Sequence, residues 1–131
     1  MTLFLHFVIL DLTITVKEGV LIMRIAYVRV STVDQNEQRQ VEALEKHDID
    51  KWFIEKVSAK DTNRPELQNM LDFIREGDTI YIHDFSRLAR STKDLLDIVE
   101  YIDGKKANLV SNKEDIDGRT HAGKFMLTLI A

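Results

Sequence analysis

The sequence predicts one α/β domain, with a mostly parallel central sheet and helices on both of its faces. Two observations support this fold class. Runs rich in β-branched and aromatic residues alternate along the chain with amphipathic runs at helical spacing. The 131 residues are 44% hydrophobic and 31% charged, which is typical of a globular domain long enough to bury a core.

Four strands are predicted, at residues 24–30, 51–57, 78–84 and 107–111. Helical segments separate them, so the strands are expected to run parallel, with their carboxyl ends at one edge of the sheet. In the first strand the side chains alternate. Tyr27, Arg29 and Ser31 therefore project to one side, and Val28 and Val30 to the other.

Amphipathic periodicity predicts helices at residues 36–47 and 65–77. The first helix is expected to turn Val41 and Leu44 inward. The second has apolar residues at i, i+3, i+4 and i+7, with Pro65 in its first turn and Gly77 at its end.

A third helix is predicted at residues 91–104, where Ser91 and Asp94 have the spacing of a capping box. Arg87 and Arg90 precede it. If that turn is helical, the two arginines are i, i+3 neighbours on one face.

The two ends of the chain have several interpretations. Residues 1–22 form an extra edge strand or a disordered arm, or lie upstream of a natural start at Met23, since codons for residues 17–19 can spell a ribosome-binding sequence. Residues 121–131 begin a helix that is apolar nearly all round, so it is buried within the monomer or against another subunit. We expect this chain to be cut short within that helix.

Composition excludes several classes of protein. The absence of cysteine excludes a disulfide scaffold, a Cys-ligated zinc site and a thiol nucleophile. A net charge of −4 and a pI of about 5.5 mean that any DNA contact is local. No signal peptide or membrane span is recognisable, and we expect a cytoplasmic protein. The acids lack metal-ligand spacing and no phosphate-binding glycine motif is present, so no metal, nucleotide or other cofactor is expected.

Arginines gather where the predicted strands end. Arg29 lies near the end of the first strand, Arg64 follows the second, and Arg87 and Arg90 follow the third. Arginine matches phosphate oxygens, and several arginines around the Ser31 hydroxyl would stabilise phosphoryl transfer. On the residues alone, Ser31 is equally a loop residue, and Arg87 and Arg90 are equally solvated charges at a helix start.

The motifs YVRVST, QVEAL, NRPEL, EGD and SRLARS, in this order, resemble those of serine site-specific recombinases, the resolvases and invertases. The resemblance runs from Met23 to Ala131 and covers their catalytic domain. It implies a resolvase-like fold, cut within the long dimerisation helix that starts in DGRTHAGKFMLTLIA. On this resemblance we expect no DNA-binding domain within the 131 residues.

The resemblance implies that Ser31 attacks a DNA phosphodiester, leaving a 5′-phosphoserine linkage that is later religated without metal or ATP. Double-stranded DNA is then the substrate, and the chain pairs as a homodimer or tetramer through its C-terminal apolar helix. The implied phosphate-binding residues are Arg29, Arg64, Arg87 and Arg90. The resemblance also places Tyr27 with the catalytic residues, where it supports the site, and it implies Gln40, Ser86 and Asp78 as supporting residues.

Two departures and two alternatives accompany this interpretation. Many members of the family carry Asp where this chain has Ser86, and several carry a basic residue where it has Phe73. One alternative is a non-catalytic remnant that pairs with an intact recombinase. The other is a generic flavodoxin-like domain whose arginines bind some other phosphate.

Overall fold

The computed structural model describes residues 8–9, 12–13, 15–17, 20–30, 37–57, 63–120, 123 and 129. Within them a five-stranded sheet has the order β6-β5-β7-β8-β9. Four of these strands are parallel, namely β5 (Arg24–Val30), β6 (Lys51–Lys56), β7 (Thr79–Ile82) and β8 (Asn108–Ser111). The short strand β9 (Ile116–Asp117) pairs antiparallel with β8 at the edge and was not predicted.

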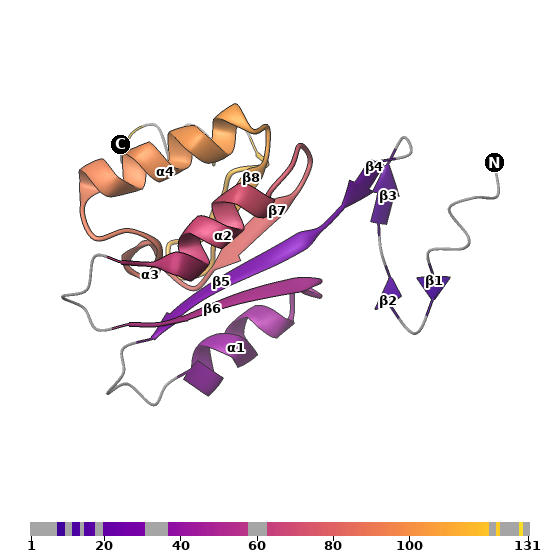
Figure 1. The fold of residues 1–131 in the computed structure, drawn as a ribbon, viewed down its shortest axis with the longest axis horizontal. Helices are drawn as coiled ribbons and strands as arrows, with labels where there is room; N and C mark the ends of the chain where they lie inside the picture. The colour runs from indigo at the N-terminus through magenta and orange to yellow at the C-terminus, as the bar shows by residue number, and fades with distance from the viewer. Residues whose placement is uncertain are drawn as a thin grey trace.

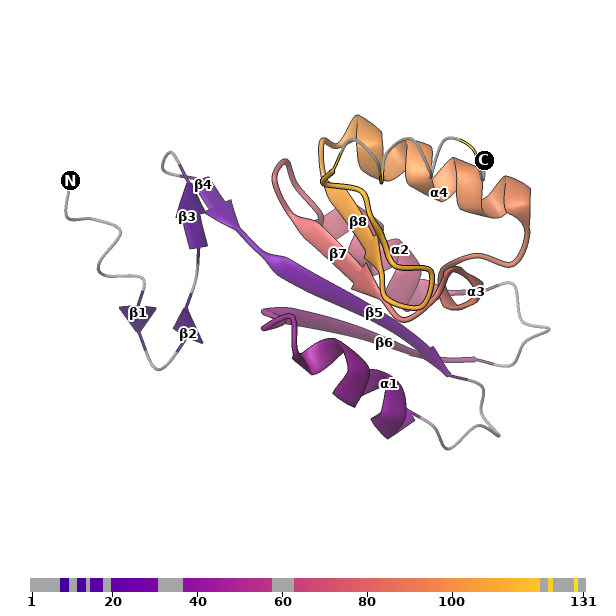
Figure 2. The ribbon, with the colours of Figure 1, turned by 180° about the vertical axis from the view of Figure 1, so that it is seen from behind.

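Helices cover both faces of the sheet (Figures 1 and 2). The helix α1 (Glu37–Glu45) lies on one face, and α2 (Pro65–Phe73) and α4 (Thr92–Gly104) lie on the other. A single turn, α3 (Phe85–Leu88), follows β7. The predicted α/β fold with helices on both faces is confirmed.

The alternation of β5 divides the core into two layers. Ile25 and Tyr27 are buried among the side chains of α2 and α4. Val28 and Val30 are buried on the opposite face with Leu44 of α1. This arrangement confirms the predicted sidedness of the described part of the first strand.

Two predicted details of the helices are wrong. The second helix ends at Phe73 and not at Gly77, because the Asp78 carboxylate accepts the Arg75 N–H, which a continuing helix would use internally. Gly77 instead occupies a turn with a φ of +91°. In α1, Gln40 is buried with Leu44, and Val41 is only half-buried.

One interpretation expected an extra edge strand before Met23, but none of the described residues there joins the central sheet. In its described residues, β1 (Val8–Ile9) pairs with β2 (Leu12–Thr13), and β3 (Thr15–Lys17) pairs with β4 (Val20–Ile22). Both are separate two-stranded ladders. The proposed start at Met23 stays a prediction. The helix predicted from residue 121 lies almost wholly outside the described residues.

Candidate active site

The strand order creates a switch point between β5 and β7. The chain leaves β5 through α1 to β6 on one side, and returns through α2 to β7 on the other. The connections after β5 and β7 therefore diverge to opposite faces of the sheet. In open α/β sheets, ligands bind in the crevice that such a divergence leaves at the carboxyl ends of the strands.

Arg29, near the end of β5, is held by the backbone of α3. Its Nη2 donates to the Ser86 carbonyl at 2.7 Å, and its Nε donates to the Arg87 carbonyl at 3.2 Å. The orientation of this guanidinium group is therefore set by a helical turn 58 residues further along the chain.

The backbone carbonyl of Arg29 receives two side chains in return. Arg87 Nη1 donates to it at 3.4 Å, and Gln40 Nε2 donates to it at 3.2 Å. Gln40 is buried in α1, so this bond ties the α1 face of the sheet to the arginine edge. Arg29 and Arg87 thus each bind the backbone of the other.

Arg64 immediately precedes α2 and is drawn into the same region. Its Nη1 donates to the Leu88 carbonyl at 2.6 Å, and its Nη2 pairs with the Asp94 carboxylate at 2.8 Å. The Arg64 side chain is only 9% exposed. Asp94 also accepts the Arg90 backbone N–H at 3.0 Å, so it joins the Arg64 loop to the Arg90 segment.

The turn after β7 is not helical as far as Arg90, so the condition for placing Arg87 and Arg90 on one helical face is not met. Helix α3 ends at Leu88, and Ala89 is extended, with φ −131° and ψ 157°. The Leu88 carbonyl and the Arg90 N–H are taken by Arg64 and Asp94, so they are not available to continue the turn. Ser91 does cap α4, since its Oγ accepts the Asp94 N–H.

Three arginines act electrostatically on Arg29. Burial lowers the pKa of Arg29 below its ordinary value, the positive charges of Arg87, Arg64 and Arg90 act in the same direction, and Tyr27 opposes them. An arginine side chain remains protonated near neutral pH despite such a shift. The region therefore concentrates positive charge in a protein of net negative charge, as a phosphate-binding site requires.

Tyr27 lies beneath this edge, where its hydroxyl donates to Glu55 Oε1 at 3.1 Å. Burial, followed by the charge of Glu55, raises the pKa of Tyr27 well above its ordinary value. Glu55 is itself buried and accepts the backbone N–H groups of Glu66 and Leu67 at 2.9 and 3.1 Å, which caps the start of α2.

Sequence reasoning did not select Glu55 or Asp94. A usable signal for Glu55 was its strand register, because it shares a face with buried Phe53 and a charge at an inward position needs a partner. Asp94 was recognised as part of a helix cap, but its spacing gave no sign that Arg64 would reach it.

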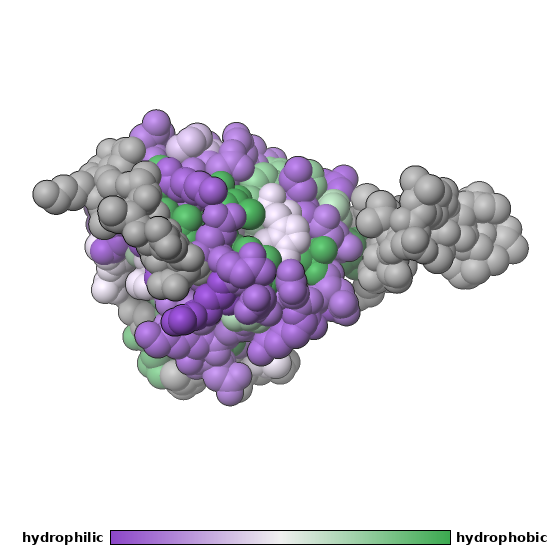
Figure 3. Space-filling model, turned by 90° about the horizontal axis from the view of Figure 1, so that it is seen from below, coloured by the Kyte–Doolittle hydropathy of each residue, from purple (hydrophilic) through white to green (hydrophobic). Residues whose placement is uncertain are grey.

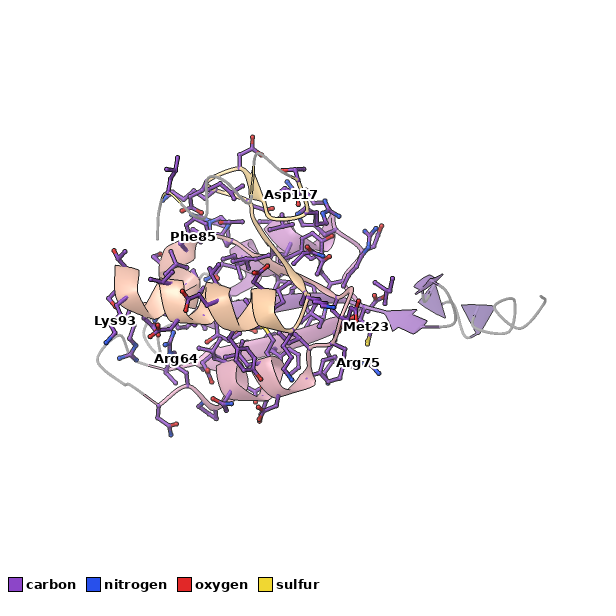
Figure 4. The ribbon with its side chains drawn as sticks, turned by 90° about the horizontal axis from the view of Figure 1, so that it is seen from above. Met23, Arg64, Arg75, Phe85, Lys93 and Asp117 are labelled. Atoms are coloured by element: carbon purple, nitrogen blue, oxygen red, sulfur yellow. The ribbon has the colours of Figure 1, made fainter. Side chains whose placement is uncertain are left out.

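The structure brings together most of the predicted site residues, but not all of them. Tyr27, Arg29, Gln40, Arg64, Ser86, Arg87 and Arg90 belong to the contacts described above. Ser31 lies outside the described residues. Asp78 lies at the opposite edge, where it accepts the Met23 and Arg75 N–H groups. Figure 4 shows Arg64 at the end of the molecule away from Met23 and Arg75.

A separate apolar hollow of about 500 Å³ lies over α1 and the edge strand β6. Its apolar lining is Val41, Ile49, Trp52 and Ile54, and Glu45 and Asp48 also border it. Figure 3 shows apolar side chains gathered among polar ones on the side where α1 lies. The hollow has no arginine in its lining, so it is distinct from the arginine edge.

Among the described residues, no three His, Asp or Glu side chains form a group that could hold a metal ion. No helix in the described part of the chain combines the length and the hydropathy needed to cross a membrane.

Two solved structures share the fold. The N-terminal catalytic domain of TP901-1 integrase has a TM-score of 0.69 at 24% identity, covering 82% of this chain and 90% of that one. A resolvase family site-specific recombinase from Streptococcus pneumoniae has a TM-score of 0.60 at 22% identity, covering 83% of each chain. These similarities establish the fold.

Similarity in sequence is stronger. The Tn917 resolvase of Enterococcus faecalis is 38% identical over 109 residues, which are 83% of this chain and 59% of that protein. The Tn501 resolvase of Pseudomonas aeruginosa is 44% identical over 93 residues, which are 71% of this chain and 48% of that protein. The chain thus spans about half the length of these relatives. The family model "Resolvase, N terminal domain" matches residues 24–131, and the chain belongs to this family.

Proposed function

We propose that this chain is the catalytic domain of a DNA serine recombinase, with Ser31 as the nucleophile. The observation that carries the proposal is the gathering of Arg29, Arg64, Arg87 and Arg90 at the carboxyl end of β5. Ser31 is the residue that follows this strand. The chain's resolvase relatives support the same assignment.

The proposed reaction exchanges one phosphodiester for another. The Ser31 Oγ forms a bond to phosphorus and loses its proton, while the bond to the 3′ oxygen breaks and that oxygen gains a proton. The 5′ phosphate stays on Ser31 until the reverse step rejoins DNA. No phosphoester bond is lost, so the exchange needs no ATP.

The arginines have distinct parts in this scheme. Arg29 and Arg87, fixed by each other's backbone, bind the non-bridging phosphate oxygens and stabilise the charge of the transition state. Arg90 is exposed and meets the phosphate from the rim of the site. Arg64 joins them from its position before α2. Tyr27, Gln40 and Ser86 support the arginines rather than contact the reacting atoms.

The test is capture of a covalent protein–DNA adduct. The chain is incubated with a pool of supercoiled plasmids that carry random inserts, denatured, and digested with trypsin. The expected nucleotide adduct is on the peptide of residues 30–39, which trypsin releases by cleaving after Arg29 and Arg39. Ser31→Ala should abolish it. Thr79→Val, which removes a hydroxyl at the opposite edge of the sheet, should retain it.

Adducts that survive in Ser31→Ala, or that map to another peptide, would contradict the assignment. If no substrate in the pool gives an adduct, the result would favour the alternative in which the chain is a non-catalytic remnant that pairs with an intact recombinase. A DNA substrate also implies that the protein works in the cytoplasm.

We further propose that the apolar segment 125–131 pairs two copies of the chain. The sequence predicts an apolar helix there, which would require burial, and a second copy of the chain offers a surface to bury it. Deleting residues 124–131 should convert a dimer to a monomer in sedimentation velocity. A wild-type chain that sediments as a monomer at every concentration would rule out this pairing.

A further inference from the structure

The carboxylate of Asp84 lies next to the pair formed by Arg29 and Arg87. Asp84 is 7% exposed and is the N-cap residue of α3. Its Oδ1 accepts the Ser86 hydroxyl at 2.5 Å and the Arg87 backbone N–H at 3.0 Å. Its other oxygen, Oδ2, lies 4.0 Å from His83 Nε2. One oxygen of Asp84 therefore holds both of the α3 residues on which Arg29 depends.

The route from Asp84 to Arg29 consists of short contacts. Asp84 fixes Ser86 and Arg87, and the carbonyls of these two residues accept the two hydrogen bonds from Arg29. Arg87 then donates back to the Arg29 carbonyl. The turn α3 has few backbone bonds of its own, from the Ala89 N–H to the Phe85 carbonyl at 2.9 Å and from the Arg87 N–H to the Asp84 carbonyl at 3.2 Å. The side-chain cap therefore adds substantially to what holds its shape.

We propose that Asp84 is a positioning residue for DNA cleavage, which acts through Ser86 and α3 to set where Arg29 and Arg87 present their guanidinium groups. Ser86 links Asp84 to α3 through its side chain, because its hydroxyl donates to the Asp84 carboxylate. The proposal rests on the proposed function for its reaction, but the coupling of Asp84 to Arg29 can be measured without any reaction.

Two variants of Asp84 separate geometry from chemistry. Asp84→Asn keeps an oxygen at the Oδ1 position, which accepts the bonds from the Ser86 hydroxyl and the Arg87 N–H, so it should preserve the arrangement. Asp84→Ala removes that oxygen. Nuclear magnetic resonance then follows the Arg29 Nε–H, whose exchange with water is slowed by its bond to the Arg87 carbonyl. Exchange should accelerate in Asp84→Ala and stay at the wild-type rate in Asp84→Asn.

The same variants are compared in the adduct assay. A displacement of the arginines should lower the cleavage rate of Asp84→Ala on the order of tenfold to a hundredfold, with a smaller effect on DNA affinity. Asp84→Asn should cleave DNA close to the wild-type rate. The cleavage rate of Ser86→Ala should lie between those of Asp84→Asn and Asp84→Ala. Val99→Ala, at a half-buried position of α4 that packs against the core, lowers stability away from α3 and should keep its cleavage rate per folded molecule.

The outcomes distinguish this inference from the proposed function. If the Arg29 Nε–H exchanges with water at the wild-type rate in folded Asp84→Ala, the inference is overturned, whether or not the chain cleaves DNA. Accelerated exchange without any Ser31-dependent adduct in the wild type shows that the coupling is real but that the proposed reaction is wrong. The proposal is supported if Asp84→Ala shows both accelerated exchange and slowed cleavage while Asp84→Asn cleaves close to the wild-type rate.

Discussion

Tyr27 and Glu55 form a buried pair, in which the tyrosine hydroxyl of β5 donates to the carboxylate of β6 at 3.1 Å. The same carboxylate caps α2 through the Glu66 and Leu67 N–H groups. Arg64 is the residue directly before that helix. The pair thus connects the strand that carries Arg29 to the segment that presents Arg64.

Glu55→Ala should destabilise the fold strongly. It leaves the Tyr27 hydroxyl and two N–H groups at the start of α2 without their acceptor, at a cost of roughly 2–4 kcal/mol in the free energy of unfolding. Glu55→Gln retains one acceptor oxygen and should cost less. Urea unfolding monitored by circular dichroism measures both values, and equal stability for Glu55→Ala and the wild type would contradict the role assigned to this carboxylate.

Tyr27 should make the fold sensitive to alkali. Its pKa is raised in the folded state by burial and by Glu55, so the folded chain keeps it protonated while the unfolded chain releases its proton near pH 10. The folded form then binds more protons, and stability falls as pH rises above about 10.

Tyr27→Phe removes this dependence. Its free energy of unfolding should decline less steeply above about pH 10 than that of the wild type. The difference in absorbance at 295 nm between the two proteins should show that Tyr27 ionises only as the wild type unfolds. An early ionisation of Tyr27 in the folded protein would count against its burial beside Glu55.

The Asp94 carboxylate should be required to hold Arg64. Asp94→Ala leaves a 9% exposed guanidinium group that still donates to the Leu88 carbonyl but has lost its carboxylate partner. Because Asp94 itself is 30% exposed, the loss should be moderate, about 1–3 kcal/mol. Asp94→Asn, which still accepts hydrogen bonds, should lose less. Thermal unfolding compares the two variants, and identical melting would show that the pair contributes nothing.

Asp78 should prove important for stability and not for chemistry. Its fully buried carboxylate accepts the Met23 and Arg75 N–H groups at the edge of the sheet away from the arginines. Asp78→Ala should lower the free energy of unfolding by about 1–3 kcal/mol. Cleavage per folded molecule should not change. A fall in the cleavage rate at temperatures where the variant is fully folded would show that Asp78 does support the site.

The strands and the gathering of arginines at one edge of the sheet were predictable because they follow from local patterns and from the order of the strands. The period-two alternation in residues 24–30 predicted which face Tyr27 and Arg29 share, and the structure has Tyr27 on the α2 face. The parallel order then predicted that the strand ends meet at one edge. Both inferences use only neighbouring residues and the general geometry of α/β sheets.

The errors arose where a specific side chain overrides helical periodicity, at short or long range. Residues 65–77 were predicted as one helix, yet the Asp78 carboxylate, three residues beyond Arg75, accepts the Arg75 N–H, and the helix ends early. The run from Arg87 to Arg90 is interrupted by Arg64, 24 residues before the carbonyl that it binds. The second of these contacts depends on tertiary structure, which spacing alone does not reveal.

The hydrogen bonds that Arg29 and Arg87 each make to the other's backbone also affect how the protein folds. Their bonds span 58 residues and require α3, which directly follows β7, to lie against β5. Contacts between distant segments form late, because the chain must first give up the entropy of closing the intervening loop. A partly synthesised or partly unfolded chain that lacks the β5–β7 pairing therefore keeps these two cations apart. The concentrated positive charge that phosphate requires appears only in molecules whose central sheet is complete.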